Sequence, residues 1–392
     1  MQLASLQLPI THYQLPITHY PLPITNYPLP MIERVAAAFE RKDYREAAQL
    51  LKQLLKTSPN NPSVQFYTGR LHEVTGKLEA AEKVYRQLLR DTTNPKIVTA
   101  ARQGLQRLET IKKEQRASAI AIAKADPGSS ELGVLILEPV AAEAKTAAAQ
   151  NFARIMNIDP YTARLLLQSR GWRLYRTGAI GELKFFGQQL REAKIPCFWV
   201  AIGEIEKINV FRVSYFQTAF PQATVICSDE SDRIGCLTFD WSEVSHRVDG
   251  LLPIFEEVVD LDYRKKLQRK VQTQDYAQFC DLHLPNRRSI LRLYDSGYQF
   301  QNGIHLTPEP DKDTIRRNWN RLLEFLNHQL PNAKVWSDFT PFAETALDQT
   351  ELLDRIKSHM HLFRRHESHW DPAFQLYSGL VFLKHLSVAG NG

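Results

Sequence analysis

The sequence predicts a multi-domain α+β protein with N-terminal helical hairpins, a small βααβαβ domain, a β-rich domain and C-terminal helices. Three observations carry this prediction. Residues 32–116 have helical periodicity and an internal repeat. Apolar strands and amphipathic helices alternate over residues 133–203, and from residue 204 onward short segments alternate between apolar and polar side chains. At 392 residues, 43% of them hydrophobic, the chain is long enough for two or three packed domains.

Residues 1–30 are predicted to be a disordered repeat tail. A seven-residue phrase recurs almost three times in LPITHYQLPITHYPLPITNYPLP and contains no charged residue. Its recurring prolines, at positions 9, 16 and 23, exclude a helix or a coiled coil. The phrase resembles translated intergenic repeats of cyanobacterial sequences. We therefore expect an untranslated or inert segment with Met31 as the start, and the alternative is a proline-rich ligand for an aromatic groove.

Residues 31–123 are predicted to form a domain of helical hairpins. Two stretches align at a spacing of 34 residues, and Pro59 closes the first. Gly69 is expected to let two helices approach closely, and Gly76 is expected in a turn. In each copy a small residue at the helix crossing is followed four positions later by a bulky one. These pairs are Ala47–Leu51 and Ala81–Tyr85.

This pattern resembles the tetratricopeptide (TPR) repeat over roughly 85 residues. It departs from the family in two respects: Gln65 replaces a large aromatic residue, and only two repeats are evident, followed by a capping helix. The resemblance implies a concave groove that binds a peptide or a helix of another protein. The residues expected to line it are Phe39, Phe66, Arg70 and Glu73. The alternative role for each is surface or inter-repeat packing.

The formal net charge of +6 is concentrated in the N-terminal third. From Glu33 to Arg116 there are 17 Lys and Arg against 10 Asp and Glu. Such an excess suits acidic partners, whether peptide tails, membrane surfaces or nucleic acid. It is also common on well-solvated helices, and we favour that interpretation.

Residues 124–132 are the predicted linker, and residues 133–203 then run strand, helix, helix, strand, helix, strand. The first strand is too apolar to be half exposed. The order resembles the compact domain shared by the C-terminal module of the ribosomal stalk protein and the protease adaptor ClpS, which implies docking of other proteins. We expect its aromatic residues in the core and not in a ligand pocket. They are Phe185, Phe186, Phe198 and Trp199.

Residues 204–346 are predicted to be a β-rich domain, followed by a C-terminal helical segment, residues 347–392. The expected strands are NVFRVSYFQTAF, ATVICS, CLTFDW, RSILRLYD and YQF. Between them lie the apolar GLLPIFEEVVDL and the basic DYRKKLQRKVQTQDYAQFCDLHL, and the long helix DTIRRNWNRLLEFLNHQL follows. Strands closed by such a helix are similar to pleckstrin-homology-like (PH-like) modules. This resemblance implies an architecture and no activity.

Five cations within seven residues form a candidate anion-binding patch for lipid or nucleic-acid phosphate. They are Arg264, Lys265, Lys266, Arg269 and Lys270. Aspartates at positions 260, 262 and 275 surround them, which favours a solvated face. No nucleic-acid-binding phrase occurs, so we do not expect nucleic acid as a partner, whereas peripheral membrane contact stays open.

No phosphate-binding glycine loop, nucleophile elbow or HExxH phrase occurs, so we expect neither a cofactor nor an enzyme. The four cysteines form no close pair, and reduced, mostly buried thiols are expected. One histidine-rich stretch, SHMHLFRRHESHWD, offers metal-ligand candidates, although its two arginines repel a cation. The candidates are His359, His366 and His369. The alternative is an amphipathic helix with its histidines in water.

The sequence thus predicts a non-catalytic interaction scaffold or adaptor that binds another protein through its TPR groove and further docking modules. The alternatives are a metal-dependent enzyme built on the histidine cluster, or a binder of phosphate-rich surfaces. No apolar run approaches the roughly 18 to 20 residues that span a bilayer, and no secretory signal is present. We therefore expect a cytoplasmic protein.

Overall fold

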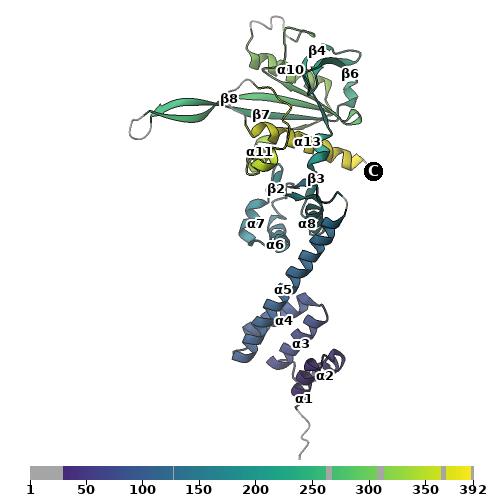
Figure 1. Cartoon of the computed structure of the whole chain (residues 1–392), viewed down its shortest axis with the longest axis vertical. Helices are drawn as coiled ribbons and strands as arrows, with labels where there is room; N and C mark the ends of the chain where they lie inside the picture. Colours follow the sequence, from purple (N-terminus) through teal and green to yellow (C-terminus); the bar gives the residue numbers. More distant parts are fainter. Residues whose placement is uncertain (1–29, 127, 262–266, 307–312, 363–367, 390–392) are drawn as a thin grey trace, which may run out of the picture. The chain divides into compact units, whose positions relative to one another are not determined.

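The computed structural model describes residues 30–126, 128–261, 267–306, 313–362 and 368–389, which Figure 1 traces along the chain. The predicted repeat tail lies outside this part except for Pro30. The chain divides into two units, Met1–Arg116 and Ala117–Gly392. The second unit therefore contains the βααβαβ region, the β-rich region and the C-terminal segment together.

The first unit is built from helical hairpins, and α5 continues from it into the second unit. The helices are α1 (Met31–Glu40), α2 (Tyr44–Thr57), α3 (Pro62–Val74), α4 (Leu78–Asp91) and α5 (Pro95–Ala125). Asp43 caps α2 by accepting a hydrogen bond from the Glu46 backbone N–H at 3.0 Å. Asn61 caps α3, and Pro62 takes its first position. Gly76 forms the turn before α4 with φ of +76°, a conformation that glycine adopts without strain.

The helices repeat at the predicted interval. Tyr44 and Leu78, the first residues of α2 and α4, are 34 positions apart. In both copies the small residue at the helix crossing is completely buried, and the bulky residue four positions later is buried too. These pairs are Ala47–Leu51 and Ala81–Tyr85. The sequence pattern was therefore a sound guide to this unit.

The second unit begins with the predicted βααβαβ order. Its elements are β1 (Leu132–Leu137), α6 (Lys145–Met156), α7 (Pro160–Leu166), β2 (Arg173–Ala179), α8 (Ile180–Glu192), β3 (Cys197–Ala201) and α9 (Ile202–Glu206). The three strands form a sheet of order β2-β1-β3, in which both neighbours run antiparallel to β1. Val134 and Ile136 lie in one buried cluster, and Leu135 and Leu137 lie in another. Both faces of β1 are covered, as its apolar sequence predicts.

A seven-stranded mixed sheet of order β10-β7-β8-β9-β4-β5-β6 follows. Its strands are β4 (Asn209–Thr218), β5 (Ala223–Ser228), β6 (Ile234–Phe239), β7 (His246–Leu261), β8 (Leu267–Leu284), β9 (Ser289–Tyr294) and β10 (Lys334–Trp336). Two short 3-10 helices, η1 (Trp241–Glu243) and η2 (Pro285–Arg287), interrupt the chain between strands. The β10–β7 and β4–β9 pairs are parallel and the others antiparallel.

Two sequence predictions about this sheet were wrong. The segments placed between strands are themselves the two longest strands, β7 and β8. A strand that extends beyond its sheet can carry polar side chains on both faces. The charged and glutamine side chains of the basic segment therefore showed no apolar–polar alternation from which a strand could be predicted. YQF, residues 298–300, was expected as a strand and instead lies in an irregular turn after β9.

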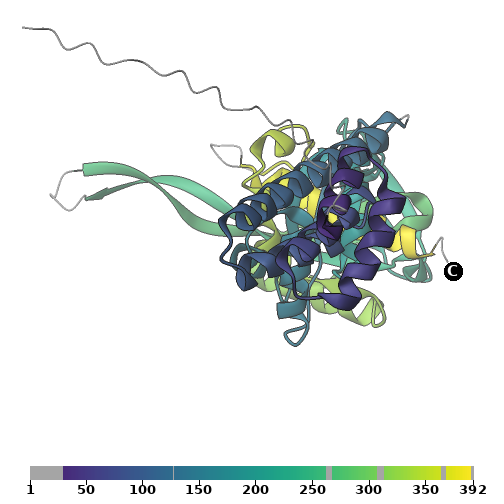
Figure 2. The same cartoon turned by 90° about the horizontal axis from the view of Figure 1, so that it is seen from below.

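The β7–β8 hairpin extends well beyond the rest of the sheet. β10 pairs with β7 only at His246–Val248, and β9 pairs with β8 only from Phe279 onward. Figures 1 and 2 both show the hairpin running out as a two-stranded ribbon. We call residues 251–261 and 267–278 the arm. A register shift between Ile254 and Phe255 leaves one extra residue on β8 within it.

Helices cover the sheets of the second unit and fill the space between them. They are α10 (Ile315–Gln329), α11 (Phe339–Ala346), α12 (Thr350–Leu353) and α13 (Trp370–Ala389). Trp319 of the predicted long helix α10 packs with buried residues of β4, β5, β8 and β9. The opposite face of β7 and β8 packs with α11, α13 and the three-stranded sheet in one cluster.

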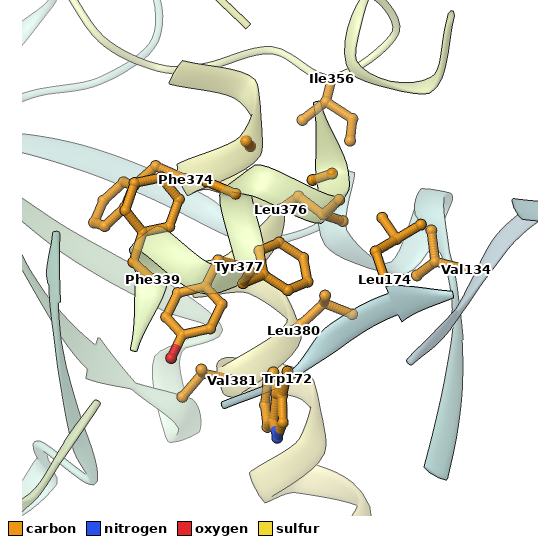
Figure 3. Close-up of a cluster of buried hydrophobic side chains, with 14 of the residues drawn as sticks. Val134, Trp172, Leu174, Phe339, Ile356, Phe374, Leu376, Tyr377, Leu380 and Val381 are labelled. Atoms are coloured by element: carbon orange, nitrogen blue, oxygen red, sulfur yellow. The ribbon is translucent and has the colours of Figure 1, made fainter. Parts of the chain in front are cut away.

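Helix α13 occupies the centre of the second unit. All of its residues from Ala373 to Phe382 are buried, so this part of the helix has no face exposed to solvent. Figure 3 shows Tyr377 and Leu380 of this helix beside Trp172, with Leu174 and Val134 near Leu376. The aromatic residues predicted for the core also lie in or against the clusters of this unit. They are Phe185, Phe186, Phe198 and Trp199.

Candidate functional site

Tyr85 joins three helices of the repeat unit. Its ring lies between Gly69 of α3 and Gly104 of α5, and a Cβ atom on either glycine would lie 2.6 Å from a ring carbon. The Tyr85 hydroxyl donates a hydrogen bond of 2.7 Å to Glu73 Oε2. Burial, followed by this hydrogen bond, raises the pKa of Tyr85 well above its usual value. The two glycines thus make the slot that the ring fills.

Glu73 is bound on its other side by Arg107 of α5. Arg107 Nε donates to Oε1 at 2.7 Å and Nη2 donates to Oε2 at 3.0 Å, which makes a bidentate ion pair. Burial alone would raise the pKa of Glu73, but the hydrogen bonds from Arg107 and Tyr85 outweigh it and hold the pKa below its usual value. Glu73 is therefore a carboxylate that fixes α3 to α5.

A contact between the Arg70 guanidinium and the Phe39 ring links α3 to α1. The Arg70 guanidinium carbon lies 5.7 Å from the centroid of the Phe39 ring, which is 8% exposed. Tyr67 packs against the same ring at a centroid distance of 5.3 Å. Arg70 Nε is buried and has no hydrogen-bond acceptor among the described residues. Arg70 therefore retains hydrogen-bonding capacity that the repeat unit does not use.

The structure brings the four predicted groove residues together on two helices. Phe66 packs against Tyr85 at a centroid distance of 6.1 Å, which connects it to the carboxylate of Glu73. Sequence reasoning missed Tyr67 and Arg107. The signal for Arg107 was present, because it follows Glu73 by 34 positions and carries the opposite charge. All four predicted residues also pack between helices, so each contributes to the architecture of the unit.

Only part of the candidate anion-binding patch is described. Arg264, Lys265 and Lys266 lie outside the described residues. Arg269 and Lys270 follow one another on β8, and successive side chains of a strand point to opposite faces. Arg269 lies 3.7 Å from Glu257 of β7. The two described cations therefore do not share a surface.

In its described part before the gap, residues 358–362, the histidine-rich stretch does not form the amphipathic helix considered from the sequence. Residues 357–362 are irregular, and His359 has φ of +51°. Arg292 Nη1 donates a 2.6 Å hydrogen bond to the Ser358 carbonyl oxygen, which a helix would bond internally. His359 Nδ1 lies 3.9 Å from Glu230, whereas His369 Nε2 lies 2.8 Å from Asp354. The two histidines thus have different partners.

Metal ligands do not gather in the described part of the chain. No three His, Cys, Asp or Glu side chains there are arranged to hold an ion, and His366 lies outside the described residues. The four cysteines are free thiols, three of them buried, as the sequence predicts. Burial raises the pKa of the Cys197 and Cys227 thiols to about 11, which keeps them protonated and unreactive at neutral pH.

A hollow of about 330 Å³ beside Arg212 of β4 was not predicted. Arg212 pairs with Asp232 at 2.5 Å and donates to the Asp229 carbonyl oxygen at 2.7 Å. His361 lines the hollow and lies 3.8 Å from Asp232. These contacts fasten residues 357–361 to the sheet, and the charges are already paired with one another. No sequence signal connects residues so far apart in the chain.

A second polar cluster is completely buried. Asp281 of β8 accepts hydrogen bonds from Arg292 of β9 and, at 2.6 Å, from Ser378 of α13. His283 Nε2 lies 3.0 Å from the Ser378 hydroxyl. A serine, a histidine and an aspartate in contact suggest nucleophilic catalysis, but here the serine proton goes to the carboxylate, and all three side chains are at most 1% exposed. This arrangement joins α13 to the sheet.

Comparison with protein families identifies one region. A tetratricopeptide repeat model matches residues 38–105, from the end of α1 to the middle of α5. Comparison with characterised proteins and with solved structures found no significant match. None of the helices in the described ranges combines the length and the apolar composition needed to cross a membrane. The chain therefore contains TPR repeats in its first unit, as predicted.

Proposed function

We propose that this chain is an adaptor that binds another protein through its TPR unit and catalyses no reaction. The observation that carries the proposal is the TPR match over residues 38–105, because such repeats generally mediate protein–protein interaction. The helical hairpins and their 34-residue interval support it. The binding residues in this proposal are the predicted set on α1 and α3, together with Arg107.

The partner segment that we propose is an extended or helical peptide with acidic and apolar side chains. Lys and Arg outnumber Asp and Glu by 17 to 10 between Glu33 and Arg116. Arg70 adds a specific reason, because it is a partly exposed cation beside the aromatic rings of α1 and α3. Phe66 and Tyr67, both half-buried beside Arg70, offer apolar contact.

The test is a peptide-display selection against the full chain, with acidic, basic and apolar sequences equally represented. We expect acidic peptides to be enriched and to bind the Arg70→Glu variant at least about tenfold more weakly, a loss of roughly 1.4 kcal/mol. Arg86→Glu is the matched control, because Arg86 lies on α4, is exposed and pairs with Glu82. Equal binding to all three proteins, with unchanged far-UV circular dichroism, would remove the groove from the proposal.

We further propose that the βααβαβ and β-rich regions are additional docking modules. The resemblance of the first region to the ribosomal-stalk and ClpS module implies this role. Tyr161 and Leu165 support it for the first region, because they lie one turn apart on α7 and are both exposed apolar side chains. Replacing both with serine should leave folding intact and weaken any binding through the βααβαβ region.

A further inference from the structure

We propose that the arm is a dimerisation surface, on which the arm of a second copy of this chain packs face to face. The arm is the part of the β7–β8 hairpin formed by residues 251–261 and 267–278. A two-stranded hairpin by itself is at best marginally stable in water. The exposed side chains of the arm show which of its faces lacks a partner.

One face of the arm carries five exposed apolar side chains together with Glu257 and Arg269. The strand register places Val259 beside Arg269 and Glu257 beside Val271, so these four side chains share a face. On β7 the alternation continues to Leu251, and on β8 the extra residue moves this face from odd to even positions, so Tyr276, opposite Pro253, also lies on it. Of the fifteen large hydrophobic side chains exposed in the described chain, five lie on this face and are 48% to 78% exposed. They are Leu251, Val259, Leu267, Val271 and Tyr276.

The opposite face of the arm is polar towards its tip and covered at its base. Glu256 pairs with Gln272 in the register, and both side chains are exposed. At the base, Leu252 and Ala277 are buried in the cluster that contains α11 and α13. The hairpin therefore packs one face at its base against the rest of the second unit and leaves the five apolar side chains of the other face exposed. Exposed apolar surface of this kind marks an interaction site.

The charges on the apolar face select a second copy as the occupant. Glu257 and Arg269 lie on different strands, 3.7 Å apart. Two-fold symmetry presents the same pair from both copies, so Glu257 of each copy can bind Arg269 of the other while the apolar side chains meet. A lipid surface would take this ion pair out of water and offer no further charge to bind it, and nucleic-acid phosphates would meet the Glu257 carboxylate beside Arg269.

Sedimentation of the full chain over a range of concentrations tests the proposal. Five exposed apolar side chains make a small interface beside the roughly 800 Å² per partner of a stable complex, so we expect a dissociation constant in the micromolar range. Val271→Lys should raise this constant at least about tenfold. Gln272→Lys is the matched control: it adds the same charge to the next residue of β8, on the opposite face, and should leave the constant nearly unchanged.

A charge exchange makes the test specific for the second copy. Glu257→Arg and Arg269→Glu should each weaken self-association, because every contact across the two-fold axis becomes repulsive. An equimolar mixture of the two variants should recover dimers, because each copy then meets the opposite charge. This recovery also excludes misfolding as the cause of the separate losses.

Three outcomes would overturn the proposal. The first is a chain that stays monomeric at all concentrations up to several hundred micromolar, far above the range expected for such an interface. The second is equal weakening by Val271→Lys and Gln272→Lys. The third is a mixture of the charge variants that remains monomeric. Binding of anionic phospholipid vesicles that is lost in Val271→Lys, with no dimer formed by the unaltered chain, would assign the face to a membrane instead.

Discussion

Asp281 and Arg292 form a bidentate ion pair from which water is excluded, with both side chains 0% exposed and Arg292 Nη2 2.7 Å from Asp281 Oδ2. Moving two charges out of water is unfavourable, and the pair persists because its hydrogen bonds are nearly complete. Ser378 supplies one more donor to the carboxylate, and the Ser358 carbonyl accepts from the guanidinium. The ion pair thus links two strands, α13 and the histidine-rich stretch.

Asp281→Asn should destabilise the second unit by about 3 to 5 kcal/mol, because the Arg292 charge remains buried without a counter-ion. Urea unfolding followed by tryptophan fluorescence measures this unit alone, since all six tryptophans follow residue 171. Asp354→Asn is the control: this aspartate forms an exposed pair with His369, and its loss should cost less than about 1 kcal/mol.

The double variant Asp281→Leu/Arg292→Met separates charge from packing. It should recover most of the stability, because two apolar side chains replace both charges at similar volume. Similar urea midpoints for Asp281→Asn and the unaltered chain would contradict the role that we assign to the pair.

Ser378→Ala should have a smaller effect, about 1 to 3 kcal/mol, because it removes a hydrogen-bond partner and no charge. It leaves His283 Nε2 without its partner in a site where Nδ1 already has none among the described residues. The same fluorescence measurement checks this, and a loss as large as that of Asp281→Asn would show that the hydroxyl does more than connect the two side chains.

Gly69→Ala should loosen the TPR unit, although glycine-to-alanine changes inside helices ordinarily stabilise by about 1 kcal/mol. The new Cβ would lie 2.6 Å from the Tyr85 ring, and we expect a net loss of about 1 to 3 kcal/mol. Hydrogen exchange of peptides from α3 and α4, followed by mass spectrometry, reports on this unit.

A second substitution provides the control for Gly69→Ala. Tyr85→Leu introduces the residue that the first repeat has at the equivalent position, Leu51. The amide hydrogens of the double variant Gly69→Ala/Tyr85→Leu should exchange more slowly than those of Gly69→Ala alone. Unchanged or stronger protection in Gly69→Ala would mean that the ring does not need the glycine.

The second unit should lose stability as the pH falls from about 6.5 to about 4. Burial, with His385 and Lys334 nearby, lowers the pKa of His246 to about 4. The unfolded chain binds a proton at this side chain near pH 6.5, whereas the folded chain does not, so stability is complete above that pH and declines below it. The slope is at most about 1.4 kcal/mol per pH unit for each such histidine.

Urea midpoints at pH 7 and pH 5 measure this dependence. His246→Gln should reduce the difference between the two midpoints, because a glutamine binds no proton in either state. Burial also lowers the pKa of His283 and His359, so part of the dependence should remain in this variant. A difference that is the same with and without His246 would contradict the prediction.

The sequence predicted local structure better than it predicted contacts between distant segments. Repeat spacing and small residues identified the TPR hairpins, since Gly69, Ala81 and Tyr85 interact within a few turns of one another. Local patterns of apolar residues likewise predicted the βααβαβ order. The candidate groove stays a prediction: Phe66, Arg70 and Glu73 are neighbours on α3, whereas Arg107, which binds Glu73, comes from another helix.

Long-range features escaped prediction because no local pattern records them. The irregular stretch at residues 357–362 depends on a hydrogen bond from Arg292, and a helix was expected there because only local periodicity was visible. The arm was missed for the opposite reason. Polar side chains lie on both faces of the arm near its tip, for example Glu256 on one face and Glu257 on the other. Neither strand therefore shows a clean alternation of apolar and polar residues in the sequence.

The position of α13 also determines the order of events during synthesis. Residues 370–389 form the centre of a unit whose sheets are encoded up to about 240 residues earlier, at β1. A ribosome that has produced both sheets still holds a chain without its central helix, so Phe339, Trp172 and their neighbours remain exposed until α13 emerges. The TPR hairpins contain their own cores and can fold well before that, so the second unit keeps apolar surface unburied for longer while the chain is being translated.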